Sequence, residues 1–217
     1  MPKLTVALAK GRLAEQAIEL FERCGIDCGQ VRDPGRKLVL SDPAGDYRFI
    51  LVKPSDVPTY VDHGVADMGV AGRDTLMEAN RPLYEMLDLG FGRCRMCVAG
   101  HAGRQPALLP SSRLRVATKY PNIAKEFYDA KGQSIEVIKL NGSVELGPLV
   151  GLSDVIVDIV ESGGTLRANG LEVLEEICPV SAQLVVNQVS LKTKAPVIRP
   201  LLAQFKQILE ERTRADA

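Results

Sequence analysis

One stretch of the sequence combines acidic, hydroxyl and glycine residues in a pattern that suits a phosphorylated sugar. Its candidate binding residues follow a β-branched run and are Asp158, Glu161, Ser162, Gly163, Gly164 and Thr165, after which a helical pattern begins at Leu166. Glycine lacks a Cβ atom, so the backbone here can adopt positive φ and come close to a ligand. The N–H groups of such a turn, and of the helix start that follows, bind phosphate oxygens. A plain strand-to-helix turn with a serine or threonine N-cap would give the same pattern.

The two acidic residues of this stretch need a separate explanation, because carboxylates repel phosphate. Asp158 and Glu161 are accounted for if they bind the hydroxyls of a sugar, or a magnesium ion that accompanies the phosphate groups. The hydroxyls of Ser162 and Thr165 add donors for the phosphate itself. We therefore expect a pocket for a phosphorylated sugar at this position.

A second glycine turn, near the N-terminus, carries positive charge. Lys10, Gly11 and Arg12 separate an expected strand at 4–8 from an expected helix at 13–24. Two cations at a helix N-terminus oppose the helix dipole, at a cost of roughly a few tenths of a kcal/mol. A bound phosphate would offset that cost, and a solvated basic turn is the alternative.

The elements that would position these turns alternate between strands and helices. Further strands are expected at 37–40, 47–52, 66–72, 114–118, 135–140, 155–159 and 183–189. Further helices are expected at 55–63, 73–79, 122–131, 144–150, 166–177 and 195–214. Arg36 and Lys53 flank the expected hairpin of the strands at 37–40 and 47–52. A segment rich in Gly, Pro and Ser at 100–112 is typical of a linker between two α/β lobes, and a cleft between lobes is a usual ligand site.

Composition argues against several functional classes. The chain has 217 residues, with 27 Lys and Arg against 27 Asp and Glu, so it lacks the basic excess typical of nucleic-acid-binding proteins. The apolar run before Lys10 is too short for a signal peptide or a membrane span, which predicts a cytoplasmic protein with reduced cysteines. Cys94 and Cys97 form a CxxC motif in an expected strand, where three-residue spacing puts them on opposite faces. A metal or redox role for this motif is therefore not expected.

With these stretches placed, the sequence resembles the short form of ATP phosphoribosyltransferase, the enzyme family of the first step of histidine biosynthesis. The matching segments lie in the family's order and cover nearly the whole chain: LAKGRL (8–13), DVPTYV (56–61), ADMGVAG (66–72), ATKYP (117–121), LNGSVE (140–145) and DIVESGGTL (158–166). Each segment alone is a weak signal. Taken together they are specific to this family.

The resemblance implies an α/β protein with the two-lobe fold of type II periplasmic binding proteins and a ligand cleft between the lobes. Lobe I would comprise residues 1–98 and 181–217 and bind ATP, and lobe II would comprise residues 99–180 and bind 5-phosphoribosyl 1-pyrophosphate. The implied reaction joins N1 of the ATP adenine to C1 of the phosphoribosyl group, and pyrophosphate leaves in the presence of Mg2+. Such chemistry needs two polyanions held in line and stabilisation of the departing charge, and no covalent nucleophile.

The resemblance also implies roles for individual residues. The segment 158–166 would bind the ribose and the 5-phosphate. The implied catalytic residues are Arg12, Glu145 and Asp158, and the last two would approach the ribose hydroxyls or magnesium. The implied ATP-binding residues are Lys10, Gly11, Arg12, Arg36, Lys53 and Asp74. Many relatives would have arginine at position 53, and lysine keeps the charge but loses the two-pronged hydrogen bonding of a guanidinium.

Resemblance to the short form implies a partner as well, namely a regulatory subunit similar to histidyl-tRNA synthetase, with a homodimer of this chain inside a hetero-octamer. Two other functions fit the residues less well. A nucleobase phosphoribosyltransferase of the Rossmann-like kind would have two adjacent acids before its glycine loop, whereas Asp158 and Glu161 are three apart. A non-catalytic ligand-binding module with the same two lobes remains the alternative from another class.

Overall fold

The computed structural model describes residues 3–103 and 113–215. Within these residues, no helix is both long enough and apolar enough to cross a membrane. The expected linker at 100–112 falls mostly outside the described residues, and its first two positions are the end of a strand.

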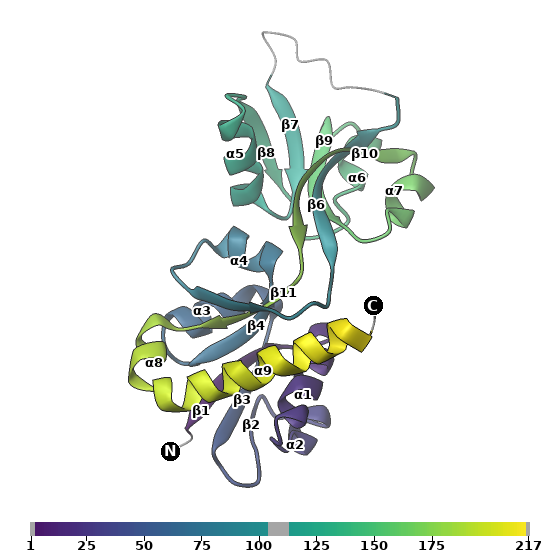
Figure 1. The fold of residues 1–217 in the computed structure, drawn as a ribbon. Coiled ribbons are helices and arrows are strands. Elements are labelled where there is room, and N and C mark those ends of the chain that lie inside the picture. The colour runs from purple at the N-terminus through teal and green to yellow at the C-terminus, as the bar shows by residue number, and fades with distance from the viewer. Residues whose placement is uncertain (1–2, 104–112, 216–217) are drawn as a thin grey trace. The chain divides into compact units, whose positions relative to one another are not determined.

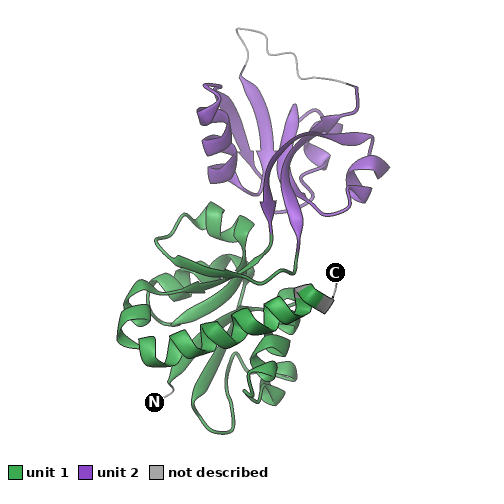
Figure 2. Ribbon diagram, viewed as in Figure 1, with its two compact units in different colours: residues 1–92, 181–217 green, residues 93–180 purple. Residues whose placement is uncertain are grey.

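The chain forms two compact units (Figure 2): unit 1, residues 1–92 and 181–217, and unit 2, residues 93–180. The first boundary lies at Gly92/Arg93 and not at the expected 98/99. The reason is that β6 (Cys94–His101) is paired along its whole length with a strand of unit 2. The first residues of β6 therefore cannot belong to unit 1.

Unit 1 is built on a six-stranded sheet with the order β2-β3-β1-β4-β11-β5. Its strands are β1 (Leu4–Ala9), β2 (Val39–Ser41), β3 (Tyr47–Val52), β4 (Met68–Gly72), β5 (Tyr84–Asp88) and β11 (Ala182–Val186). β1 is parallel to both β3 and β4, whereas β11 runs antiparallel between β4 and β5. The sheet is thus completed by a strand from the far end of the sequence.

Helices cover both faces of this sheet (Figure 1). They are α1 (Arg12–Arg23), α2 (Gly29–Arg32), the 3-10 turn η1 (Pro54–Asp56), α3 (Val57–Asp62), α4 (Arg73–Ala79), α8 (Gln188–Thr193) and α9 (Ala195–Ala215). α1 and α9 pack on one face, where the rings of Phe49 and Phe205 meet Phe21 edge-on at centroid distances of 5.4 and 5.0 Å. α3 and α4 pack on the other face, in a cluster that includes Val61 and Leu76. The alternation of β1 side chains between these two clusters explains why every residue of this strand is buried.

One glycine of β4 permits the close approach of α3. A Cβ atom on Gly69 would lie 2.8 Å from Val57 Cγ1 and 2.9 Å from Val61 Cγ2. Those distances are shorter than real carbon contacts, so α3 would have to move away from the sheet. The ADMGVAG segment therefore includes a packing requirement that is unrelated to ligand binding.

A buried carboxylate ties the returning C-terminal segment to the first strand of unit 1. Asp67 is only 5% exposed, and its Oδ2 accepts hydrogen bonds from the backbone N–H of Thr5 and from Lys194 Nζ, both at 2.8 Å. Its Oδ1 accepts from Ser190 Oγ at 2.7 Å. Asn187 caps the N-terminus of α8 through the backbone N–H groups of the next turn, and its own amide donates to the carbonyl of Val61. Residues from both ends of the chain are thus joined through polar contacts that replace hydration.

Replacing Asp67 by alanine is expected to lower the free energy of unfolding by about 2–4 kcal/mol, because three buried or half-buried donors lose their acceptor. Denaturant titration followed by circular dichroism measures this loss. Asp46→Ala is a matched control, since Asp46 forms a 2.7 Å pair with Lys3 at an exposed position and its loss should change stability little. Equal effects of the two substitutions would contradict the role assigned to Asp67.

Unit 2 is built on a five-stranded sheet with the order β10-β6-β9-β7-β8. The remaining strands are β7 (Leu114–Thr118), β8 (Ile135–Lys139), β9 (Val155–Val160) and β10 (Leu171–Val180), and the helices are α5 (Pro121–Ala130), α6 (Leu146–Leu149) and α7 (Gly164–Ala168). β7 is parallel to β8 and β9, whereas β6 is antiparallel to β9 and β10. In Figure 1, α5 covers one face of the sheet, and α6 and α7 lie on the other.

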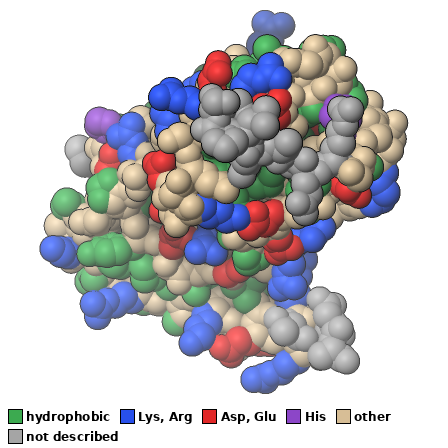
Figure 3. Space-filling model, turned by 90° about the horizontal axis from the view of Figure 1, so that it is seen from above, with side chains coloured by type: hydrophobic (Ala, Val, Ile, Leu, Met, Phe, Trp, Pro, Cys, Tyr) green, Lys and Arg blue, Asp and Glu red, His purple; other side chains and the backbone are tan. Residues whose placement is uncertain are grey.

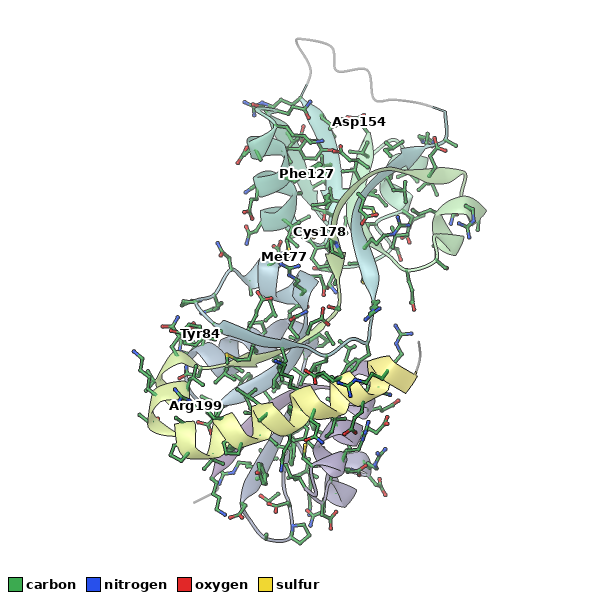
Figure 4. All side chains as sticks on the ribbon, viewed as in Figure 1. Met77, Tyr84, Phe127, Asp154, Cys178 and Arg199 are labelled. Atoms are coloured by element: carbon green, nitrogen blue, oxygen red, sulfur yellow. The ribbon has the colours of Figure 1, made fainter. Side chains whose placement is uncertain are left out.

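A forked ion pair fixes the start of β9. The guanidinium of Arg115 donates to both carboxylate oxygens of Asp154, at 3.3 Å from Nε and 2.7 Å from Nη2, and its Nη1 donates to the carbonyls of Gly151 and Leu152. Asp154 lies at the end of unit 2 where β7 begins (Figure 4). Hydrogen bonds from Arg115 lower the pKa of the Asp154 carboxyl from its ordinary value of 3.8. The pair therefore stabilises the folded state only while Asp154 is ionised.

This lowered pKa predicts how the stability of an Arg115→Gln variant should compare with the wild type. A depressed folded-state pKa gives stability that is complete above the ordinary value of 3.8 and is lost as pH falls through the lowered value. The difference in melting temperature between the two proteins should be constant from about pH 8 to about pH 5 and shrink below pH 3.8. It should not vanish, because the carbonyl contacts of Arg115 do not titrate. A difference that stays constant down to the lowest pH would contradict the assignment.

The expected helix at 166–177 is wrong. α7 ends at Ala168, Gly170 adopts a φ of 68°, and Leu171–Val180 forms the strand β10. The register of β10 against β6 shifts twice, between Val173 and Glu175 and again between Glu176 and Cys178. Each irregularity moves the side chains to the opposite face, so the alternation that normally identifies a strand is lost.

Candidate active site

The three parallel strands of unit 2 end at one edge of the sheet, called here the carboxyl edge of unit 2. β7 lies in the middle, with β9 on one side and β8 on the other. Three of the segments singled out in the sequence start from these strand ends: 117–121, 140–145 and 158–166. The chain leaves β7 for a helix on one face and leaves β9 for a helix on the other (Figure 1). Ligands of open α/β sheets bind at carboxyl ends where neighbouring connections diverge in this way.

The glycine turn after β9 has the expected geometry. Gly163 adopts φ 72° and ψ 10°, the left-handed region, and serves as the N-cap of α7. Its carbonyl accepts from the N–H of Arg167 at 3.1 Å, and the N–H of Gly164 lies 3.4 Å from Ser162 Oγ. Ser162, Gly164 and Thr165 are exposed, so their polar groups can meet a ligand.

Leu166 departs from the rest of this turn, because its side chain is 5% exposed and packs in the cluster of unit 2 that contains Ile156 and Val160. Only its backbone could therefore contact a substrate. The side chain instead anchors the turn to the sheet. This anchor holds the exposed polar groups of the loop against a rigid support.

Three acidic residues of unit 2 are site candidates, and two of them belong to the segment 158–166. Asp158 is half-buried within β9, and its Oδ1 accepts from the N–H of Ile159 at 2.9 Å. Glu161 is exposed at the start of the turn. Glu145 is half-buried at the N-cap of α6, and the adjacent Val144 packs in the same cluster as Leu166. The structure thus brings Glu145 to the face of the sheet on which the glycine turn is anchored.

The ATP-binding candidates of unit 1 also lie at the carboxyl ends of parallel strands. Lys10, Gly11 and Arg12 follow β1, and Gly11 adopts a φ of 113°. Lys53 follows β3, and Asp74 lies in the first turn of α4, which follows β4. All three strands are parallel, so these residues share one edge of the sheet.

Arg36 lies at the same edge of the sheet, although it comes before a strand and not after one. It precedes β2, which runs antiparallel to β3, and the N–H of Leu51 donates to the carbonyl of Leu38 at 2.9 Å. The start of β2 therefore lies beside the end of β3, and with it the exposed Arg36. The ATP-binding candidates come together within unit 1, and the sugar- and phosphate-binding candidates come together within unit 2.

Sequence reasoning assigned no role to Thr118, although it belongs to the ATKYP segment. It is the last residue of β7, and its hydroxyl hydrogen-bonds to the backbone of β9 and of the α5 N-terminus. A β-branched residue at the end of a strand is ordinary, so no sequence signal marks this one. Ser143, whose φ is 48°, is a second such case, since nothing in its identity indicates a left-handed conformation.

The face of the molecule shown in Figure 3 carries charges of both signs. Lys and Arg side chains are interspersed there with Asp and Glu, and neither sign covers a broad area. Recognition of an anionic ligand would therefore depend on the local groups at the strand ends.

Three of the five cysteines, Cys24, Cys28 and Cys97, are packed in environments that disfavour the thiolate. Burial raises the pKa of Cys28 to about 12 and that of Cys24 to about 11, and it also raises the pKa of Cys97. Thiols with raised pKa values stay protonated at neutral pH and are poor nucleophiles and ligands. Within residues 3–103 and 113–215, no group of three or more His, Cys, Asp or Glu side chains is arranged to hold a metal ion.

Comparison with known proteins agrees with this geometry. Residues 53–207 match the family model described as ATP phosphoribosyltransferase. The chain is 55% identical over 213 residues to the ATP phosphoribosyltransferase of Lachnoclostridium phytofermentans, covering 97% of this chain and 99% of that one. It is 57% identical to that of Alkaliphilus metalliredigens, covering 95% of this chain and 98% of the relative.

Solved structures give the same result for the fold. The ATP phosphoribosyl transferase (HisG:HisZ) complex from Thermotoga maritima contains a chain with a TM-score of 0.84 and 37% identity, covering 96% of this chain and 98% of that chain. The periplasmic aliphatic sulphonate binding protein SsuA from Escherichia coli has a TM-score of 0.57 at 14% identity, covering 98% of this chain and 74% of that one, which is a likeness of fold alone. The expected α/β fold of type II periplasmic binding proteins is confirmed. The family match over most of the sequence, the full-length relatives and the glycine turn at the end of β9 together show that this chain belongs to the ATP phosphoribosyltransferase family.

Proposed function

We propose that this chain transfers the phosphoribosyl group of 5-phosphoribosyl 1-pyrophosphate, the phosphoribosyl donor, to N1 of ATP. The products are phosphoribosyl-ATP and pyrophosphate, and the reaction is the first step of histidine biosynthesis, carried out in the cytoplasm. The observation that carries the proposal is the glycine turn at the carboxyl edge of unit 2, which follows the strand that contains Asp158 in a chain of this family. A turn with left-handed Gly163 suits the 5-phosphate, and the adjacent carboxylate suits the pentose.

The charges on the two strand edges fit the changes that occur during the reaction. As the bond from C1 to pyrophosphate breaks, positive charge develops on the ribose and negative charge on the leaving group. Asp158 and Glu145 would stabilise the ribose, and Arg12 would stabilise the pyrophosphate or the ATP phosphates. Lys10, Arg36 and Lys53 would hold ATP, since each is exposed at the edge of the unit 1 sheet where β1 and β3 end. Binding both polyanions in line would then supply most of the rate enhancement.

Magnesium fits this site as an ion shared with the substrate. Asp158 and Glu145 offer the carboxylate oxygens that Mg2+ prefers, and Mg2+ usually combines one or two carboxylates with water and substrate phosphates. No larger cluster of ligand side chains exists among the described residues, so the donor's pyrophosphate would provide further oxygens. When bound, the ion would neutralise charge on the pyrophosphate. Asp158 and Glu145 would orient the ribose relative to it.

A partner subunit is part of the proposal. The chain from Thermotoga maritima to which this one is similar belongs to a HisG:HisZ complex. We infer that this chain works with a regulatory subunit of the HisZ kind, similar to histidyl-tRNA synthetase, as homodimers within a hetero-octamer. Copurification with the full-length chain, followed by mass measurement of the intact assembly, tests this.

The activity is tested by incubating the chain with ATP, the phosphoribosyl donor and Mg2+, with and without the partner subunit. We expect pyrophosphate and phosphoribosyl-ATP in equal amounts, identified by mass spectrometry. If free nucleobases react and ATP does not, the chain is a nucleobase phosphoribosyltransferase. If both substrates bind and no pyrophosphate forms even with the partner, the chain is a binding module.

A further inference from the structure

The side chain of Thr118 occupies the point where the two central strands of unit 2 separate. Thr118 is 0% exposed and is the last residue of β7. Its Oγ1 donates to the carbonyl of Val157 in β9 at 2.6 Å and accepts from the backbone N–H of Tyr120 at 2.8 Å. The parallel pairing of β7 with β9 ends at the pair Thr118 and Val157. The hydroxyl therefore satisfies two backbone groups that the diverging strands would otherwise leave buried without partners.

The contact to Val157 bears directly on Asp158. The accepting carbonyl belongs to the peptide group that links Val157 to Asp158, so a bond at 2.6 Å fixes the plane from which the Asp158 side chain departs. On the C-terminal side of Asp158, its Oδ1 accepts a hydrogen bond from the N–H of Ile159. One hydrogen bond before Asp158 and one after it therefore contribute to the placement of its carboxylate.

The backbone of Thr118 also makes a hydrogen bond to the chain just after β8. Its carbonyl accepts from the N–H of Leu140 at 3.0 Å, immediately after β8. Leu140 leads into the loop of residues 141–145, which adopts the left-handed conformation at Ser143 and ends at Glu145. Thr118 is therefore hydrogen-bonded to the chain segments that lead to two of the three acidic candidates of unit 2, Asp158 and Glu145.

We propose that Thr118 is a positioning residue of the reaction, which sets the place of Asp158, and through the loop at 141–145 that of Glu145, relative to the glycine turn. The inference rests on the proposed function, because it requires Asp158 to meet the ribose of the donor. Thr118 itself does not touch substrate, since it is fully buried. Small displacements of a reacting group cost about 100-fold in rate per ångström, so a hydroxyl with no substrate contact can still control turnover.

The test compares Thr118→Val, which keeps the shape and removes the hydroxyl, with Thr118→Ser, which keeps the hydroxyl. In the enzyme assembled with its partner subunit, we expect Thr118→Val to lower kcat/KM for the phosphoribosyl donor about 10- to 100-fold while KM for ATP stays the same. Thr118→Ser should restore the value to within about threefold. Ser153→Ala is the matched control, because Ser153 is 3% exposed in the same unit and its Oγ has no hydrogen-bond partner among the described residues.

A double-mutant cycle separates positioning from loss of structure. If Thr118 acts through Asp158, then Thr118→Val should have little further effect in an Asp158→Asn background, whereas a general structural defect would lower activity equally in both backgrounds. Melting curves confirm that each variant is folded at the assay temperature. Wild-type kinetics in Thr118→Val, equal defects in the Val and Ser variants, or additive effects in the cycle would each overturn the inference and leave the proposed function standing. Absence of product with the wild-type assembly would instead overturn the proposed function, and the role of Thr118 with it.

Discussion

Replacing Asp158 by asparagine is expected to lower kcat/KM for the phosphoribosyl donor by about 10- to 150-fold, because a hydrogen bond to an ionised group contributes about 1.5–3 kcal/mol. The asparagine keeps an oxygen that can accept from the N–H of Ile159, so the local structure survives. It loses the negative charge that would stabilise the ribose as pyrophosphate departs. Both kcat and KM for the donor should change, whereas KM for ATP should not. Steady-state kinetics with each substrate varied in turn measures these effects.

The Asp158 experiment has a simple control in the same unit. Asp129 is exposed near the end of α5, and Asp129→Asn removes the same charge at a position remote from the carboxyl edge of unit 2. Its kinetics should match the wild type. If Asp158→Asn also showed unchanged kinetics while melting at the wild-type temperature, Asp158 would have no part in the reaction.

Replacing Gly163 by valine is expected to abolish measurable binding of the phosphoribosyl donor. At φ 72° a side chain costs roughly 1–2 kcal/mol, and more for a β-branched one, so the turn would relax to another conformation. A Cβ atom would also lie 3.1 Å from Arg167 Nη1. The Arg167 side chain can turn away from this contact, so the backbone strain is the effect that moves the N–H groups that would hold the 5-phosphate. Isothermal titration calorimetry with the donor measures the loss.

Gly132→Val is the matched control for conformational strain. Gly132 has a φ of 67°, a Cβ atom there would meet nothing within 4 Å, and the residue lies in the turn between α5 and β8, away from the carboxyl edge. Backbone strain should lower the free energy of unfolding by a similar amount in the two variants. Only Gly163→Val should lose affinity for the phosphoribosyl donor. Retained affinity in Gly163→Val would exclude the turn as the phosphate site.

The fold could be predicted wherever the apolar residues of a segment repeat with the spacing of a helix or a strand. β1, β3, α1 and α9 carry regular apolar patterns, and the structure confirms them within a few residues. β5 was not expected, because Tyr84–Asp88 is stabilised by pairing with β11, which lies far away in the sequence. α8 was not expected either, since a strand was predicted to continue to 189, where Asn187 instead caps a short helix.

The helix wrongly expected at 166–177 shows which signal was overlooked. Asn169-Gly170 is a common turn dipeptide, and Gly170 indeed ends α7 in the left-handed conformation. The two register shifts of β10 then removed the alternation that would have identified a strand. A strand with such irregularities is determined by its partner and not by its own sequence.

The candidate site could be predicted as a set of positions, but not as a set of contacts. The types and order of residues 158–165 predicted a strand, a glycine turn and a helix start, and the structure has all three. The half-buried setting of Asp158, the buried side chain of Leu166 and the hydroxyl bridge of Thr118 depend on which strands are neighbours. That information is absent from any single segment. The catalytic roles themselves stay predictions until the variants are measured.

The insertion of β11 between β4 and β5 has a consequence for how the protein is made. At a synthesis rate of about 5–20 residues per second, a ribosome delivers β11 roughly 5–20 s after β5. The ribosome uses that interval to make unit 2, whose strands all come from one continuous stretch that ends at Val180. The nascent unit 1 meanwhile exposes the unpaired side of β4, and such an edge invites aggregation. Premature termination of translation before Ala182 would therefore release a chain whose N-terminal sheet is still open, even though every candidate residue for ATP binding has already been synthesised.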